Sequence, residues 1–122
     1  MDILAGEFGG RRIKTVSKLP YRPTKSRVRK SIFDSLMPFR FSMVLDLFSG
    51  SGILGFEAAS RGAQSVTFVE KHNSTLRLIK ENAASLAGPS YTFKHCGVMS
   101  FLHQSGSFDL IFADPPYGTG NL

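Results

Sequence analysis

Hydrophobic positions recur along the chain with two different periods. From residue 41 onward, apolar runs of strand length alternate with segments whose apolar residues recur at helical spacing. The strand runs are 43–48, 65–70, 91–95 and 108–114, and helical segments follow at GSGILGFEAASR, from about Asn73, and at VMSFLHQ. This alternation predicts an α/β fold with a parallel sheet, and right-handed crossovers favour the strand order 3-2-1-4.

The first 40 residues follow a different pattern. DILAG and RRIKTV, on either side of Gly9-Gly10, predict a short hairpin that Pro20 closes. A helix is expected from Thr24, its N-cap, until Pro38 stops it. Helical spacing places Val28, Ile32, Phe33 and Leu36 on one face, and Lys25, Arg27, Arg29 and Lys30 largely around the other. A hairpin and a basic amphipathic helix are therefore expected before the sheet.

Composition narrows the class of protein. With 122 residues, 42% hydrophobic residues and 11 Phe, the chain can bury one core, which excludes disorder. The single cysteine, Cys96, leaves no intrachain disulfide, and the three histidines match no metal-ligand spacing. No segment has the apolar length of a signal peptide or a membrane span. We therefore expect a cytoplasmic protein with no metal and no membrane contact.

The charge is concentrated at one end. Residues 1–40 hold ten Lys and Arg against three Asp and Glu, a net charge of +7, whereas residues 41–122 hold five against six, a net charge of −1. This asymmetry fits a polyanion-binding segment on a near-neutral body, and charge alone fits a solvated surface that aids solubility equally well. The chain is accordingly divided into a basic region at 1–40 and a core at 41–122, and the resemblance described below implies RNA binding for the first and S-adenosylmethionine binding for the second.

The first strand leads into a glycine turn that is typical of a ligand site. In Asp46-Leu-Phe-Ser-Gly50-Ser-Gly52-Ile-Leu-Gly55, the glycines allow close backbone approach and the helix start presents free N–H groups. Glu70 ends the second strand 20 residues after Gly50, where a carboxylate can accept two hydrogen bonds from a ribose diol. The pattern leaves two ligand classes open, a dinucleotide and S-adenosylmethionine.

Asp46 bears on that choice. A carboxylate inside the turn opposes a pyrophosphate but can receive the ammonium group of a methionine moiety. It can also hold the turn by accepting backbone N–H bonds, and the two roles are compatible.

A second motif follows the fourth strand. Asp114-Pro115-Pro116-Tyr117 lies at the predicted carboxyl end of that strand, across the crevice from the glycine turn. The two prolines remove N–H donors, so the loop offers a carboxylate and carbonyls, all acceptors, followed by an aromatic ring. A rigid pair of acceptors suits the two hydrogens of an exocyclic amino group, and Tyr117 can stack on the base.

These motifs resemble those of a known family. Asp-Pro-Pro-Tyr is the signature of S-adenosylmethionine-dependent amino-methyltransferases. The segments LAG, GRR, RPTKSRVRKSIFD and VLDLFSGSGILGFEAASRGA occur in matching order and make the chain similar to the RsmD family over nearly its whole length. The resemblance implies a Rossmann-like class I methyltransferase sheet. It also implies methylation of a guanine N2 amine in 16S ribosomal RNA or in an assembling small ribosomal subunit.

The resemblance also implies roles for individual residues. The methionine end of the cofactor is assigned to Asp46, Phe48, Gly50 and Gly52, the ribose to Glu70, and apolar and backbone contacts with adenine to the region of Val98. Asp114, Pro115 and Tyr117 would hold the guanine, with Asp114 as the proton acceptor. Thr24 and Arg27 would contact the cofactor carboxylate or the RNA. Phosphate contacts are expected from the N-terminal cations Arg11, Arg12, Lys14, Arg22, Arg27 and Arg29.

Two alternatives to this enzyme remain at this point. One is a non-catalytic RNA-binding or assembly module on the same fold, and the other is an amino-methyltransferase that acts on another nucleic acid. The non-catalytic module is suggested by the length of the chain. Family members resemble one another in having three further strands beyond the fourth, so a shortened chain is expected here. The fourth strand would then be an apolar edge, and if the chain is complete we expect self-association to cover it.

Overall fold

The protein consists of alternating strands and helices that follow an N-terminal segment. The structure is a computed structural model that describes residues 1–15, 25–102 and 106–113. Along this part of the chain the elements are α1 (Ser26–Ser35), β1 (Met43–Leu47), α2 (Ile53–Ser60), β2 (Ser65–Glu70), α3 (Asn73–Ser85), β3 (Ser90–His95), α4 (Val98–Leu102) and β4 (Leu110–Ala113). These bounds confirm the predicted elements, most of them to within one or two residues.

The four strands form one parallel sheet in the order β3-β2-β1-β4. Right-handed crossovers dictate this order when the chain first winds outward from β1 and then returns to its other side. Leu47 pairs with Val69 of β2 and with Ala113 of β4, so the carboxyl ends of these three strands lie together. The predicted strand order is confirmed.

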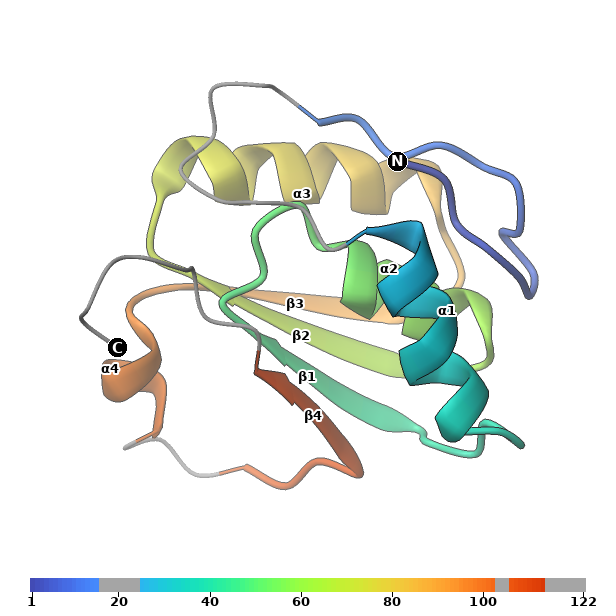
Figure 1. The fold of residues 1–122 in the computed structure, drawn as a ribbon. Helices are drawn as coiled ribbons and strands as arrows, with labels where there is room; N and C mark the ends of the chain where they lie inside the picture. Colours follow the sequence, from blue (N-terminus) through green and yellow to red (C-terminus); the bar gives the residue numbers. More distant parts are fainter. Residues whose placement is uncertain (16–24, 103–105, 114–122) are drawn as a thin grey trace.

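The two faces of the sheet are covered unequally (Figure 1). Helices α1, α2 and α3 pack on one face, where the larger hydrophobic cluster includes Phe33, Phe56, Phe68 and Phe112. Helix α4 covers the other face, where Phe101 packs on the smaller cluster with Leu45, Leu47 and Val69. Phe101 and Phe112 are buried in these two clusters, and Phe108 is half-buried beside Phe101.

The N-terminal segment folds back on itself as predicted. Ile3 N–H donates to the carbonyl of Arg11 at 2.9 Å, Gly10 N–H donates to Ile3 at 2.7 Å, and Asp2 forms an antiparallel bridge with Arg12. Ile3, Phe8 and Ile13 are buried in the same cluster as the sheet. The first 15 residues therefore share the core of the α/β body.

Helix α1 turns Ile32, Phe33 and Leu36 toward the core as expected, but two positions depart from the prediction. Val28, predicted on the apolar face, is 47% exposed, whereas Arg29, predicted on the polar face, is only 2% exposed. The reason is a buried carboxylate on α2, which gives the Arg29 guanidinium a partner inside the protein. The helix begins after Lys25, and Thr24, expected as its N-cap, lies outside the described residues.

Strand β4 begins two residues later than predicted and lies at the edge of the described sheet. Asp109 precedes it, and its Oδ2 accepts N–H bonds from Ser42 at 3.1 Å and Met43 at 2.8 Å. Ile111 is 53% exposed, and among the described residues β1 is the only strand that pairs with β4. The apolar edge expected from the sequence is therefore present in the part of the chain described here.

Candidate functional site

The turn between β1 and α2 has the backbone conformation that its glycines allow. Phe48, Gly50 and Gly52 have φ angles of 55°, 56° and 81°. A Cβ on Gly52 would lie 2.8 Å from Cε2 of Phe56, so both the angle and the space require glycine there. Gly55 serves packing, because a Cβ at this position would lie 2.4 Å from Cε1 of Phe68.

Asp46 holds this turn from inside. Its side chain is buried, with the residue 2% exposed, and Oδ2 accepts the N–H of Gly55 at 3.1 Å. Next to it, Ser49 Oγ donates to the carbonyl of Asp46 at 2.6 Å and accepts the N–H of Val69 at 3.1 Å. The predicted structural role of Asp46, accepting backbone N–H bonds, is confirmed.

Glu70 reaches the same turn from the end of β2. Its Oε2 accepts the N–H of Gly50 at 3.1 Å, its Oε1 accepts the N–H of His72 at 3.1 Å, and the residue is 8% exposed. Each carboxylate oxygen can accept a further hydrogen bond, so these contacts are compatible with a ligand hydroxyl. Two carboxylates from neighbouring strands thus bracket one glycine turn.

An apolar wall adjoins the carboxyl ends of β1 and β2. Phe48, Cys96 and Val98 are half-buried and pack against the cluster of Leu45, Leu47, Val69 and Phe101. Val98 is the first residue of α4. Phe48 and Val98, expected near opposite ends of the ligand, border the same apolar cluster, and Cys96 is a free, partly buried thiol.

Several predicted site residues lie outside the described residues. They are Arg22, Thr24, Asp114, Pro115 and Tyr117. Ala113, the residue that precedes Asp114 in sequence, pairs with Leu47 of β1. The roles of all five remain predictions.

The predicted RNA-binding cations that the structure describes differ in exposure. Arg29 is buried, whereas four are exposed: Arg11, Arg12, Lys14 and Arg27. Arg12 has a 78% exposed side chain and pairs with Asp2 at 3.0 Å, and Lys14 and Arg27 are exposed. The hydrogen bond and charge of Arg12 lower the pKa of Asp2 below its ordinary value. Arg11 is exposed as well, but its Nη2 donates to the carbonyl of Ser85 at 2.5 Å.

Arg29 is buried and does not contribute to an exposed basic surface. Its side chain is 3% exposed, and Nη1 lies 3.5 Å from Oε1 of Glu57 and 2.9 Å from the carbonyl of Asp2. Burial lowers the pKa of Arg29 from its ordinary value, while the charges of Glu57 and Asp2 act in the opposite direction. The expectation that Arg29 binds phosphate is therefore wrong, because its guanidinium is enclosed by the protein.

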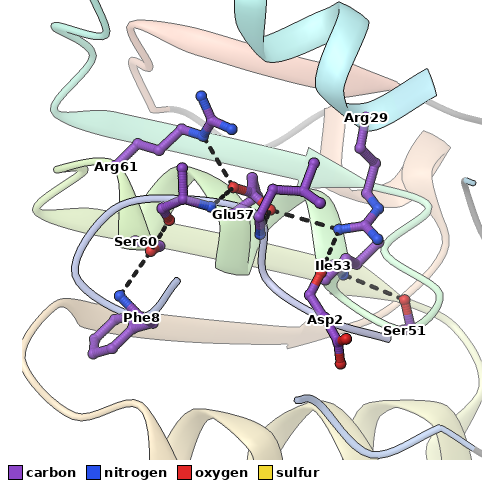
Figure 2. Close-up of polar contacts among 10 residues, drawn as sticks. Asp2, Phe8, Arg29, Ser51, Ile53, Glu57, Ser60 and Arg61 are labelled. Atoms are coloured by element: carbon purple, nitrogen blue, oxygen red, sulfur yellow. Dashed lines mark hydrogen bonds and ion pairs between the residues drawn. The ribbon is translucent and has the colours of Figure 1, made fainter. Parts of the chain in front are cut away.

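Glu57 is the residue that sequence reasoning missed. Figure 2 shows its carboxylate between Arg29 of α1 and Arg61 at the end of α2, with the N-terminal segment on its third side. The side chain is 0% exposed, although it carries a charge. One signal was available: Glu57 is the only charged residue in the mostly apolar helix ILGFEAAS.

No group of three or more His, Cys, Asp or Glu among the residues that the structure describes could hold a metal ion. None of the described helices has the length and hydropathy needed to cross a membrane.

Comparison with known proteins relates this chain to methyltransferases. A family model described as "Conserved hypothetical protein 95" matches residues 1–122. "Ribosomal RNA small subunit methyltransferase D" of Haemophilus influenzae is 38% identical over 121 residues, and the Escherichia coli protein of the same name is 35% identical over 122 residues. The alignments cover 94% and 98% of this chain, which spans only 63% and 62% of those relatives.

A solved structure agrees with the sequence relatives. It is described as "Putative methyltransferase yhhF from Escherichia coli", and it matches all of this chain and 67% of its own with a TM-score of 0.85 and 34% identity. The parallel sheet of order β3-β2-β1-β4 thus matches those of class I methyltransferase structures, as predicted. Since the family model covers every residue, the chain belongs to the conserved hypothetical protein 95 family and resembles the RsmD methyltransferases within it.

Proposed function

We propose that this protein is part of an S-adenosylmethionine-dependent enzyme that methylates the N2 amine of a guanine in 16S ribosomal RNA. The observation that carries the proposal is the glycine turn bracketed by the buried carboxylates of Asp46 and Glu70. The names of the two curated relatives described above, which specify methylation of small-subunit ribosomal RNA, support the substrate class. The choice of guanine N2 draws on the resemblance of the Asp-Pro-Pro-Tyr motif.

The residues of the turn fit this cofactor. Glu70 lies at the end of β2, where its oxygens can accept hydrogen bonds from the two hydroxyls of a ribose, in addition to those from the backbone N–H groups of Gly50 and His72. Asp46 places a negative charge inside the turn, which favours an ammonium group over a pyrophosphate. Gly50 and Gly52 give the turn its positive φ angles, and Phe48 and Val98 border an apolar surface for a base.

The residues that would bind the guanine amine follow β4, which lies on the other side of β1 from β2 and Glu70. Asp114 directly follows Ala113, which pairs with Leu47 at the end of β1, next to the glycine turn. Asp114 and the carbonyl groups of the motif would accept the two hydrogens of the guanine amine, and Tyr117 would stack on its ring. When bound, S-adenosylmethionine supplies an activated methyl group, so Asp114 mainly orients the amine and accepts its proton.

The exposed N-terminal cations would bind the RNA backbone. Arg12, Lys14 and Arg27 present their charges to solvent on a region whose net charge is +7. Phosphate contacts of this kind position an RNA without reading its sequence, and they would offset the few kcal/mol that flipping a base out of its stack costs.

Methyl transfer to undermodified small ribosomal subunits tests the proposal. The protein is incubated with S-adenosylmethionine labelled in its methyl group, and the labelled nucleotide is mapped. We expect one labelled guanine in 16S ribosomal RNA. Label on another base rejects the guanine N2 assignment, and RNA binding without any label indicates a non-catalytic binding module.

A further inference from the structure

The buried carboxylate of Glu57 joins the N-terminal segment to two helices (Figure 2). It accepts the backbone N–H of Leu4 at 2.9 Å and of Ala5 at 3.2 Å, and it pairs with Arg61 at 3.0 Å and Arg29 at 3.5 Å. A fully buried carboxylate is costly unless hydrogen bonds and opposite charges surround it. Here the N-terminal segment supplies two of those donors.

Ser60 continues this attachment one helical turn further on. Its Oγ accepts the N–H of Phe8 at 2.8 Å and donates to the carbonyl of Ala5, and its backbone carbonyl accepts the N–H of Glu7 at 2.8 Å. The two backbones approach so closely that a Cβ on Gly6, whose φ is +85°, would lie 2.1 Å from the Ser60 carbonyl oxygen. Residues 4–8 are therefore hydrogen-bonded to Glu57 and Ser60 along α2, and these two residues are called the docking track below.

The track connects the two regions that the proposed function uses. Helix α2 begins after Gly52 of the glycine turn and ends at Ser60, so one short, buried helix carries the turn at one end and the docking track at the other. The docked residues 4–8 are followed within a few positions by Arg12 and Lys14, both exposed. The position of Arg12 relative to the turn thus depends on how residues 4–8 are held, whereas Lys14 is also held by two hydrogen bonds with Asn82 of α3.

We propose that Glu57 and Ser60 are positioning residues, which hold the N-terminal RNA-binding segment against α2 and thereby set its cations relative to the cofactor turn. The inference rests on the proposed function for the identity of the ligand. The docking itself is a property of the free protein, which allows the two to be tested separately.

A double-mutant cycle separates positioning from stability. Glu57→Leu removes the acceptor for Leu4 and Ala5 and leaves Arg29 without this partner. Arg29→Met breaks the same ion pair and the hydrogen bond to the carbonyl of Asp2, but it leaves the acceptors of Leu4 and Ala5 in place. The double variant removes both charges of this pair, a change that is often neutral for stability or stabilising, and leaves Arg61, whose side chain is 10% exposed, without this carboxylate. Each variant is measured by thermal unfolding, by amide hydrogen exchange, and by its Kd for an unmodified transcript of small-subunit ribosomal RNA.

Glu57→Leu is expected to lower Tm, to speed exchange at Leu4 and Ala5 by about tenfold or more, and to raise the RNA Kd by about tenfold. Arg29→Met is expected to lower Tm with exchange at those two amides and the Kd close to wild type. The double variant should regain part of the Tm lost in Glu57→Leu without regaining slow exchange or RNA affinity. Lys14 N–H, which donates to Asn82 Oδ1 at 2.8 Å instead, is the internal reference.

Unchanged exchange at Leu4 and Ala5 in Glu57→Leu would overturn the inference, and so would a Kd that simply follows Tm through the cycle. If Glu57→Leu does not fold, Ser60→Ala replaces it, with Phe8 as the reporting amide and unchanged exchange there as the contrary result. Failure of the wild-type protein to bind RNA would reject the proposed function instead, since the exchange data are independent of RNA.

Discussion

Glu57 and Arg29 form a buried ion pair between α2 and α1, with side chains that are 0% and 3% exposed. Arg61 supports the pair from the end of α2, where its guanidinium also lies 4.9 Å from the ring centroid of Phe33. The N-terminal segment closes the pair off from solvent by donating two backbone N–H groups to Glu57. A charged cluster thus occupies the junction at which three parts of the chain meet.

The Glu57–Arg29 ion pair predicts a large loss of stability in Arg29→Met. Removing one partner leaves a buried carboxylate with fewer compensating charges, and we expect the free energy of unfolding to fall by about 3 kcal/mol in urea titrations. Arg12→Gln is the matched control, because it breaks an exposed pair with Asp2 and should leave the urea midpoint nearly unchanged. Equal effects of the two substitutions would contradict the prediction.

The close packing around Gly55 predicts that Gly55→Ala destabilises the core. In Gly55→Ala the new Cβ would lie 2.4 Å from Phe68 Cε1 and 2.9 Å from Val66 Cγ1, so both side chains must move. Overpacking of this kind should lower the free energy of unfolding by about 1–3 kcal/mol. Gly97→Ala, where a Cβ would meet nothing within 4 Å, serves as the control for unfolding measurements. Comparable stability of the two variants would show that the core adapts freely at Gly55.

Glu70 predicts a loss of cofactor affinity. Glu70→Ala removes the carboxylate expected to bind the ribose, and calorimetric titration with S-adenosylmethionine should show binding weaker by about 1.5–3 kcal/mol. The loss of its bonds to Gly50 and His72 should also reduce stability, so unfolding is measured in parallel. Glu81→Ala, on the exposed side of α3, controls for the change of net charge. An unchanged Kd in Glu70→Ala would reject the ribose role.

The exposed N-terminal cations predict how RNA affinity depends on salt. Replacing Arg12 and Lys14 with Ala should reduce the slope of log K against log salt concentration by about one for each phosphate that the protein no longer neutralises. As a control, Lys71 and Arg77 are replaced with Ala, which removes the same charge from another part of the protein. Lys71 is exposed in the loop between β2 and α3, and Arg77 is exposed on α3. If both pairs change the slope equally, the N-terminal segment has no special part in RNA binding.

Asp114 predicts a separation of catalysis from cofactor binding. Asp114→Ala should abolish methyl transfer, because the amine loses its orienting acceptor, while the Kd for S-adenosylmethionine stays close to wild type. The two quantities are measured on the same preparation by methyl incorporation and by calorimetry. Turnover that survives the substitution would remove Asp114 from the mechanism.

The sequence by itself determined the architecture, because the relevant signals are local. Apolar runs and helical spacing place β2 at Ser65–Glu70 and α3 from Asn73, and alternation with right-handed crossovers favours the strand order that the structure has. The glycine turn could be predicted for the same reason. Its conformation depends on residues a few positions apart, and Gly50 and Gly52 have the positive φ angles that favour glycine.

Only the tertiary structure decided which charges are buried. Arg29 and Val28 exchange their expected faces because Glu57, distant in sequence, places a carboxylate against α1. The backbone N–H of Leu4 reaches the same carboxylate across 53 residues. Helical periodicity records how a helix turns but not what lies opposite it, and the cost of burying one charge is offset only where the fold brings its partners together.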